Sequence, residues 1–169
     1  MTMLRAVAFA LLVAAPAAAQ DREMLGAQLS QLASGGPEVL QAAYAACILG
    51  GGTVDGAVAL FADHGWTRMD DVEMSSTELR STATEVVVTL YDEGRICAVV
   101  SEKLGTETAN GALVPVIALA GWPMKSVEMA DGCTAYQLGD GLMASVTSSG
   151  QDPVCYSTDS SDVRFTFGP

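Results

Sequence analysis

The stretch EVVVTLYDEGRICAVV, at positions 85–100, constrains the fold more than any other part of the chain. Two runs of β-branched and aromatic residues flank Asp92-Glu93-Gly94, and a short acidic turn closed by glycine is typical of a β-hairpin with Gly94 in the left-handed conformation. With three turn residues, Tyr91 faces Arg95, and Cys97 then falls on the less apolar face of the hairpin. The pattern predicts two antiparallel strands at the centre of a sheet.

The sequence before this hairpin recurs after it. A shift of 56 residues superposes Gly65-Trp66 on Gly121-Trp122, and a shift of 55 superposes Val72-Glu73-Met74 on Val127-Glu128-Met129. A shift of 58 superposes Cys97 on Cys155. Differences this small are what loop insertions produce, so the pattern predicts a tandem duplication with units at about 53–101 and 108–158.

The predicted fold class is α+β, with one antiparallel sheet of about six or seven strands packed by helices. Each unit would contribute a helix, a Gly-Trp corner and two or three strands, after two extra N-terminal helices. Pro115 falls inside the second repeat helix and is expected to kink it or delay its start. The strands expected in the second unit cover residues 133–138, 142–147, 154–157 and 163–167.

The duplicated order of helix and strands resembles that of the secreted β-lactamase inhibitor proteins, which are also tandem helix-plus-sheet repeats with disulfides. The resemblance is one of architecture and carries no shared motif. It therefore implies a fold and no function.

Residues 1–19 have the pattern of a secretory signal peptide. Arg5 precedes an apolar run too short to span a bilayer, and the small residues Ala17 and Ala19 stand just before Gln20. Cleavage after Ala19 would leave residues 20–169 as a single exported domain, periplasmic or secreted. A lipid anchor is not expected, because no cysteine lies near the cut.

All four cysteines lie in the predicted mature chain, and an even count in an exported chain favours two disulfides. We expect Cys47–Cys97 and Cys133–Cys155, one in each half. The first pairing would require the N-terminal helices to cover one face of the sheet while the repeat helices cover the other. The second would require Cys133 to lie in a loop or beside Cys155, because two cysteines separated by a middle strand are too far apart to bond.

The charge of the mature chain excludes some partners. Removing Arg5 from the 8 Lys and Arg leaves 7 against 20 Asp and Glu, a formal charge of −13. Nucleic acids and anionic lipids are therefore not expected as partners, since Lys and Arg must neutralise their phosphates. Acidity can serve solubility alone, or it can attract a basic partner.

Four sets of residues invite a functional interpretation, each beside a structural one. His64 ends an apolar helical stripe and is interpreted as structural. Trp66 and Trp122 are interpreted as core anchors, although tryptophan is also common at interface hot spots. Asp70, Asp71 and Glu73 are carboxylates that an acid–base hydrolase could use. Four methionines near the corners could bind Cu(I) or simply fill the core: Met69, Met74, Met124 and Met129.

No catalytic, metal or cofactor motif is present, and no cofactor is expected. The function predicted first is a non-enzymatic exported module that binds a protein or small ligand, or inhibits an enzyme, through a sheet face or the Gly-Trp corners. The alternatives are a small periplasmic hydrolase and methionine-based copper handling. The sequence does not indicate an oligomeric state.

Overall fold

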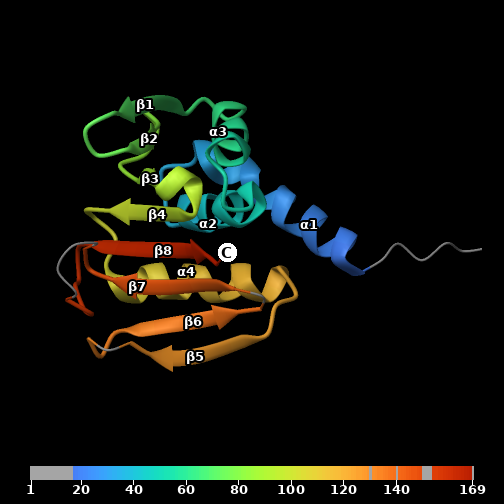
Figure 1. Cartoon of the computed structure of the whole chain (residues 1–169), viewed down its shortest axis with the longest axis vertical. Helices are drawn as coiled ribbons and strands as arrows, with labels where there is room; N and C mark the ends of the chain where they lie inside the picture. Colours follow the sequence, from blue (N-terminus) through green and yellow to red (C-terminus); the bar gives the residue numbers. More distant parts are fainter. Residues whose placement is uncertain (1–16, 130, 140, 150–153, 169) are drawn as a thin grey trace, which may run out of the picture.

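The computed structural model describes residues 17–129, 131–139, 141–149 and 154–168, and these form four α-helices and one sheet (Figure 1). The α-helices are α1 (Ala17–Gln28), α2 (Glu38–Gly50), α3 (Val54–Ala62) and α4 (Thr106–Leu119), with short 3₁₀ helices η1 (Leu29–Ala33) and η2 (Asp92–Gly94). The strands are β1 (Thr67–Asp71), β2 (Ser76–Arg80), β3 (Val87–Tyr91), β4 (Ile96–Ser101), β5 (Met124–Glu128), β6 (Thr134–Leu138), β7 (Leu142–Thr147) and β8 (Ser161–Phe167). No helix in these ranges is long and apolar enough to cross a membrane.

The eight strands form one antiparallel sheet in the order β1-β2-β3-β4-β8-β7-β6-β5. The α+β class with a helix-packed antiparallel sheet is therefore confirmed. The first four strands follow α3 and the last four follow α4, so each half supplies a helix, a Gly-Trp corner and four strands, more than predicted. This shared order suits a tandem duplication, which stays a prediction.

The helices cover one face of the sheet and leave the other without a helix (Figure 1). Helix α2 lies in the middle of this layer and contacts α1, α3, α4 and β4. Its sequence is apolar all round, as expected for a helix buried on every side, and Tyr44 packs its ring 5.7 Å from that of Phe165 on β8. The predicted sheet with helices on both faces is wrong.

The register of the central hairpin explains this difference. Tyr91 pairs with Ile96, one residue beyond the predicted partner Arg95, because the turn spans four residues, with Arg95 N–H bonded to the Asp92 carbonyl oxygen. Shifting the register by one residue moves a whole strand's side chains to the opposite face. Cys97 therefore joins Leu90 on the apolar face, beneath α2.

Both disulfides have the expected pairing. Cys47 on α2 is bonded to Cys97 on β4, with Cα atoms 5.8 Å apart, and Cys133 is bonded to Cys155 with Cα atoms 4.9 Å apart. Residues 154–157 are not a strand, so Cys155 lies in the segment before β8 and reaches Cys133 at the start of β6. Cys155 is thus not equivalent to Cys97, which lies within β4.

Helices α3 and α4 begin and end largely as predicted. The Thr53 hydroxyl accepts a hydrogen bond from Gly56 N–H and caps α3, and a left-handed glycine follows each helix, Gly65 and Gly121. Helix α4 continues through Pro115 from its start at Thr106, so the predicted late start is wrong. Pro115 has no backbone N–H, so it cannot donate a hydrogen bond to the carbonyl oxygen of Gly111 one turn earlier. Both residues are exposed, so water can donate to that carbonyl oxygen instead.

The predicted signal peptide lies mostly outside the described residues, which begin with α1 at Ala17. Helix α4 begins at Thr106 and β8 ends at Phe167, whereas the division into units at about 53–101 and 108–158 stays a prediction. Strands β1, β2 and β5 were not predicted as separate strands. Glu73 lies in the turn after β1 whereas Glu128 ends β5, so these two glutamates are not equivalent.

Candidate functional site

The face of the sheet opposite the helices, here called the open face, is the largest candidate surface (Figure 1). Antiparallel partners point to the same side and alternate residues to opposite sides, so the strand registers define its members. On the four central strands these are Val87, Thr89, Tyr91, Ile96, Ala98, Val100, Asp162, Arg164, Thr166, Met143, Ser145 and Thr147. On the outer strands they are Thr67, Met69, Asp71, Ser76, Glu78, Arg80, Ala135, Gln137, Lys125 and Val127.

Large apolar side chains stand half-buried on the open face with no described helix above them. They come from three of the four central strands: Val87, Tyr91, Ile96 and Val100 from the neighbouring strands β3 and β4, and Met143 from β7 on the far side of β8. On the helix face, by contrast, Val88, Leu90, Val99 and Phe165 are all at most 1% exposed. The open face therefore mixes partly accessible apolar side chains with polar ones, a composition typical of binding surfaces.

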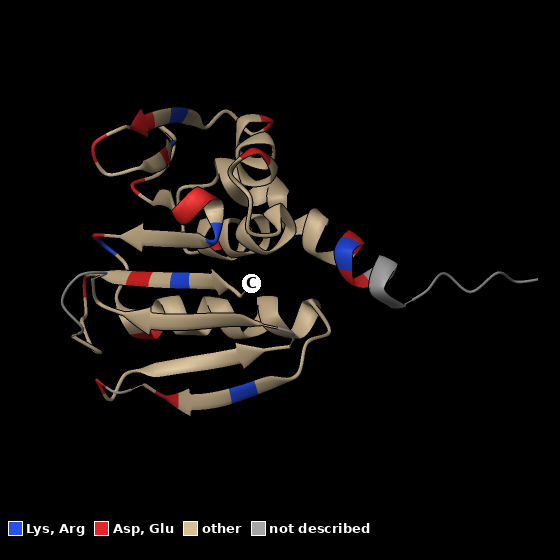
Figure 2. Cartoon of the chain, in the orientation of Figure 1, with Lys and Arg blue, Asp and Glu red and all other residues tan. Residues whose placement is uncertain are grey.

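An ion pair stands at the centre of the open face. Arg164 Nε donates a 3.1 Å hydrogen bond to Asp162 Oδ2, both on β8 (Figure 2). Arg164 lies directly between two small buried residues, Ala98 on β4 and Ser145 on β7. In the described part of the chain this is the only hydrogen bond of the guanidinium, so its terminal N–H groups are left for a partner.

Asp162 is a buried carboxyl group, only 2% exposed, and its Oδ1 atom has no partner among the described residues. Burial raises the pKa of this carboxyl, and Arg164 offsets part of that rise. Keeping the buried Asp162 carboxylate charged costs free energy. Its hydrogen bond from Arg164 Nε holds the guanidinium at a defined place on the sheet.

The open face is nearly balanced in charge, whereas Asp and Glu far outnumber Lys and Arg along the chain as a whole (Figure 2). Its basic residues Arg80, Arg164 and Lys125 are matched by the acidic residues Asp71, Glu78 and Asp162. Two pairs are direct ion pairs, Arg80 with Glu78 and Arg164 with Asp162. The excess of carboxylates therefore lies on the rest of the molecule.

The β1–β2 hairpin borders the open face and carries exposed apolar side chains. Met69 on β1 is 55% exposed, and Val72 and Met74 in the turn are 88% and 61% exposed. The turn is the most exposed apolar segment of the described chain.

The two Gly-Trp corners differ, although the sequence predicts equivalent buried places for both tryptophans. Trp66 is 4% exposed, stacks on Phe61 and donates from Nε1 to the Leu32 carbonyl oxygen, so it is a core anchor as predicted. Trp122 is only half-buried, and within the described residues its indole N–H has no hydrogen-bond partner.

Trp122 lies between two shallow hollows of about 430 and 540 Å³ that share Ile48, Gly51 and Trp122. Asp21 and Arg22 line the first, and the apolar residues Leu138, Leu142 and Phe167 line the second. These volumes fall within the range of small-molecule sites. No set of polar groups converges in them to indicate a ligand class.

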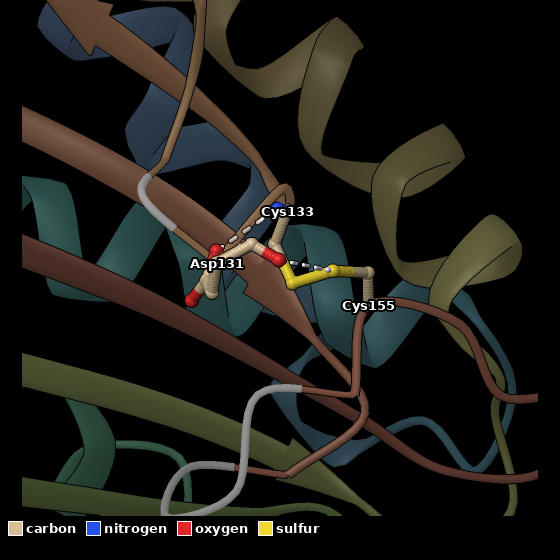
Figure 3. Close-up of side chains that lie close together, drawn as sticks. All are labelled: Asp131, Cys133 and Cys155. Carbon is tan, nitrogen blue, oxygen red and sulfur yellow. Dashed lines mark hydrogen bonds between the residues drawn. A yellow bond between two sulfur atoms is a disulfide. The ribbon is translucent and has the colours of Figure 1, made fainter.

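A cluster with the composition of a metal site lies beside the second disulfide (Figure 3). One ligand atom each from Asp131, Cys133 and Cys155 lies within 4.8 Å of the others, but both sulfurs are joined in the disulfide. Asp131 Oδ1 instead accepts a 2.9 Å hydrogen bond from Cys133 N–H, so its carboxylate orders the turn before β6.

The carboxylates considered for a hydrolase are exposed, and two of them accept hydrogen bonds. Asp70 accepts hydrogen bonds from Thr77 and Arg68, which hold the pKa of its carboxyl below the usual value. Asp71 Oδ1 accepts from Met74 N–H, and Glu73 is exposed in the same turn. General acid catalysis needs a carboxyl whose pKa is raised by burial, whereas Asp70 is exposed and the pKa of its carboxyl is lowered.

The four methionines neither fill the core nor gather at one site, and Met69, Met74 and Met124 are 55%, 61% and 46% exposed. Met69 and Met74 belong to the hairpin containing β1, whereas Met124 and Met129 belong to β5 and the turn after it, and these are the two outermost strands of the sheet. Eight strands at about 4.8 Å spacing separate them by roughly 34 Å. A copper site made from these four residues is therefore wrong.

His64 has the structural role that the sequence predicted. Its Nδ1 atom donates a 2.9 Å hydrogen bond to the Leu60 carbonyl oxygen, one turn back at the end of α3. That bond satisfies one of the carbonyls that every helix leaves without a partner at its C-terminus.

The sequence reasoning missed the Asp162–Arg164 pair. The signal was present in SDVRFTF, where Val163, Phe165 and Phe167 alternate with Asp162, Arg164 and Thr166. Strict alternation predicts a strand with one buried and one polar face, and opposite charges two residues apart on that strand lie side by side.

No family model, no curated protein and no solved structure matches this chain.

Proposed function

We propose that this chain is an exported, non-enzymatic binding module whose open face receives a protein partner. Inhibition of an enzyme is one form that such binding can take. The observation that carries the proposal is the eight-stranded sheet with helices on one face only, the other presenting half-buried apolar side chains around the Asp162–Arg164 pair.

The composition of the open face supports a protein as the partner. Tyrosine, methionine and arginine are enriched in protein interfaces, and Tyr91, Met143 and Arg164 all lie on the central strands of this face. Arg164 is the best candidate for a hot spot, since a neighbouring carboxyl group holds it in place and its terminal N–H groups remain available.

The charge distribution supports a partner with a basic surface around its contact region. A formal charge of −13 attracts basic proteins over long distances and raises their association rate. The balanced open face then lets the two surfaces meet without a large desolvation cost for unpaired carboxylates.

Export is supported by the N-terminal pattern at residues 1–19 and by the two disulfides. Disulfides persist in oxidising compartments such as the periplasm or the extracellular space. Residues 20–169 would then be the mature domain.

The test is a quantitative pulldown from the extracytoplasmic fraction of the producing cell, followed by titration of the retained protein after purification. Two variants alter half-buried positions on the open face, Val100→Glu and Thr166→Glu. A matched control, Met24→Glu, adds the same charge at an exposed apolar side chain on α1, away from the sheet.

We expect a protein that binds wild type and Met24→Glu equally and binds both open-face variants at least about tenfold more weakly, the effect of losing one well-buried contact. Retention that is equal for all four proteins would show that the open face is not the binding surface. The thermal midpoint of each variant, measured in parallel, separates lost contacts from lost folding.

A further inference from the structure

The turn of the β1–β2 hairpin exposes an unusual amount of apolar surface. Val72 is 88% exposed, Met74 is 61% exposed and Met69, at the base of the turn, is 55% exposed. Single exposed apolar residues are normal on a protein surface, but three within six positions form a patch. Patches of this kind mark interaction sites.

The turn is held in one conformation before any partner arrives. Asp71 Oδ1 accepts a 2.9 Å hydrogen bond from Met74 N–H across the turn. At its base, Asp70 Oδ1 accepts a 2.7 Å hydrogen bond from Thr77 Oγ1, which joins β1 to β2, and a 2.8 Å hydrogen bond from Arg68 Nε within β1. A segment ordered in advance loses little conformational entropy on binding, so its apolar side chains contribute more of their burial energy to affinity.

Carboxylates surround the apolar residues of the turn. Glu73 lies between Val72 and Met74 in the sequence and is exposed, and Asp71 precedes Val72. In the described part of the chain, neither Asp71 nor Glu73 forms an ion pair. A surface that receives this turn must therefore offer an apolar pocket for Val72 and positive charge around it.

We propose that the β1–β2 turn inserts Val72 into an apolar pocket on a protein partner whose rim carries Lys or Arg. This inference rests on the proposed function, because Met69 and Asp71 belong to the outermost strand of the open face and one partner can contact both surfaces. The turn would supply the projecting anchor, and the open face the broad contact.

The first experiment is site-specific photo-cross-linking in the producing cell, with p-benzoylphenylalanine incorporated in place of one residue at a time. The positions are Val72 in the turn, Val100 on the open face and Met24 on α1 as the control. A discrete cross-linked protein is expected from Val72 and Val100, and none from Met24.

The second experiment titrates the cross-linked protein, once purified, against Val72→Ala, Glu73→Gln and Met24→Ala of the mature chain. We expect about a tenfold loss of affinity for Val72→Ala, the effect of one buried valine side chain. Glu73→Gln should slow association at low salt and have little effect at high salt. Met24→Ala should bind as the wild type does.

Because Val72 and Glu73 are exposed, these substitutions should leave the thermal midpoint unchanged, which keeps folding out of the comparison. No discrete cross-link from position 72, or an affinity unchanged by Val72→Ala, overturns the inference. A cross-link from position 100 without one from position 72 overturns the inference and leaves the proposed function standing. The reverse result supports the turn as the contact and overturns the open face.

Discussion

The indole Nε1 of Trp66 donates a 3.0 Å hydrogen bond to the backbone carbonyl oxygen of Leu32. This bond joins the corner after α3 to η1, which lies far away in the sequence, and both residues are buried. At the matching corner after α4, Trp122 makes no such bond among the described residues. The two corners share the Gly-Trp pattern, but a buried hydrogen bond stabilises only the corner at Trp66.

We predict that Trp66→Phe lowers the free energy of unfolding by about 2 kcal/mol, because it leaves a buried carbonyl unsatisfied and opens a small cavity. Trp122→Phe should cost less than about 1 kcal/mol, since the indole is half-buried and makes no bond. Urea denaturation of both variants measures the difference. Equal losses for the two variants would contradict it.

The same two variants isolate each tryptophan for fluorescence. The protein with Trp122→Phe retains buried Trp66 and should emit at shorter wavelength and resist quenching by iodide. The protein with Trp66→Phe retains Trp122 beside two open hollows and should emit at longer wavelength with stronger quenching. Identical emission from both would show that Trp122 is as buried as Trp66.

Removing either disulfide should destabilise the protein, and removing the one that closes the longer loop should destabilise it more. The Cys47–Cys97 bond spans 50 residues and the Cys133–Cys155 bond spans 22. The chain-entropy model gives about 4 and about 3 kcal/mol, respectively. Paired Cys→Ala substitutions compared by urea denaturation would measure both, and a variant as stable as the wild type would refute the expected contribution of that bond.

Two carboxyl groups should act on stability with opposite signs as pH changes. Burial raises the pKa of Asp162, so the folded state holds its proton more tightly than the unfolded state, and stability falls as pH rises above about 4. Hydrogen bonds from Thr77 and Arg68 lower the pKa of Asp70, so its contribution is present above about pH 4 and is lost as pH falls.

Asp162→Asn should therefore gain stability relative to the wild type as pH rises above about 4, whereas the stability that Asp70→Asn lacks relative to the wild type should shrink as pH falls below about 4. Urea denaturation at several pH values measures both differences. Parallel pH profiles for the two variants would contradict the assignment.

The sequence indicated the α+β class, the four α-helices and the disulfide pairing, because apolar periodicity and cysteine positions carry those features. The hairpin register was missed because Asp92 and Glu93 adopt positive φ angles of 52° and 57°, which are uncommon for residues other than glycine. Apolar residues occur on both faces of β3 and β4, so the pattern could not reveal the one-residue shift.

The open face was harder to predict for a related reason. Strands β1 and β2 read TRMDD and STELR, and β1 is exposed along its whole length, so neither has the apolar alternation that marks a strand. Cys97 points to the same face as Leu90, and its disulfide to Cys47 holds α2 on that face with the other helices. Only the geometry of the turn between β3 and β4 determines to which face Cys97 points.

Strand β8 has a consequence for how the protein acquires its fold. Residues 161–167 come after all seven other strands in the sequence but lie in the middle of the sheet, between β4 and β7. Their pairing with residues 96–101 is long-range, and contacts between distant parts of a chain form slowly. The sheet cannot close before residues 161–167 are available, so the two sets of strands on either side of β8 stay unjoined until this segment pairs with both.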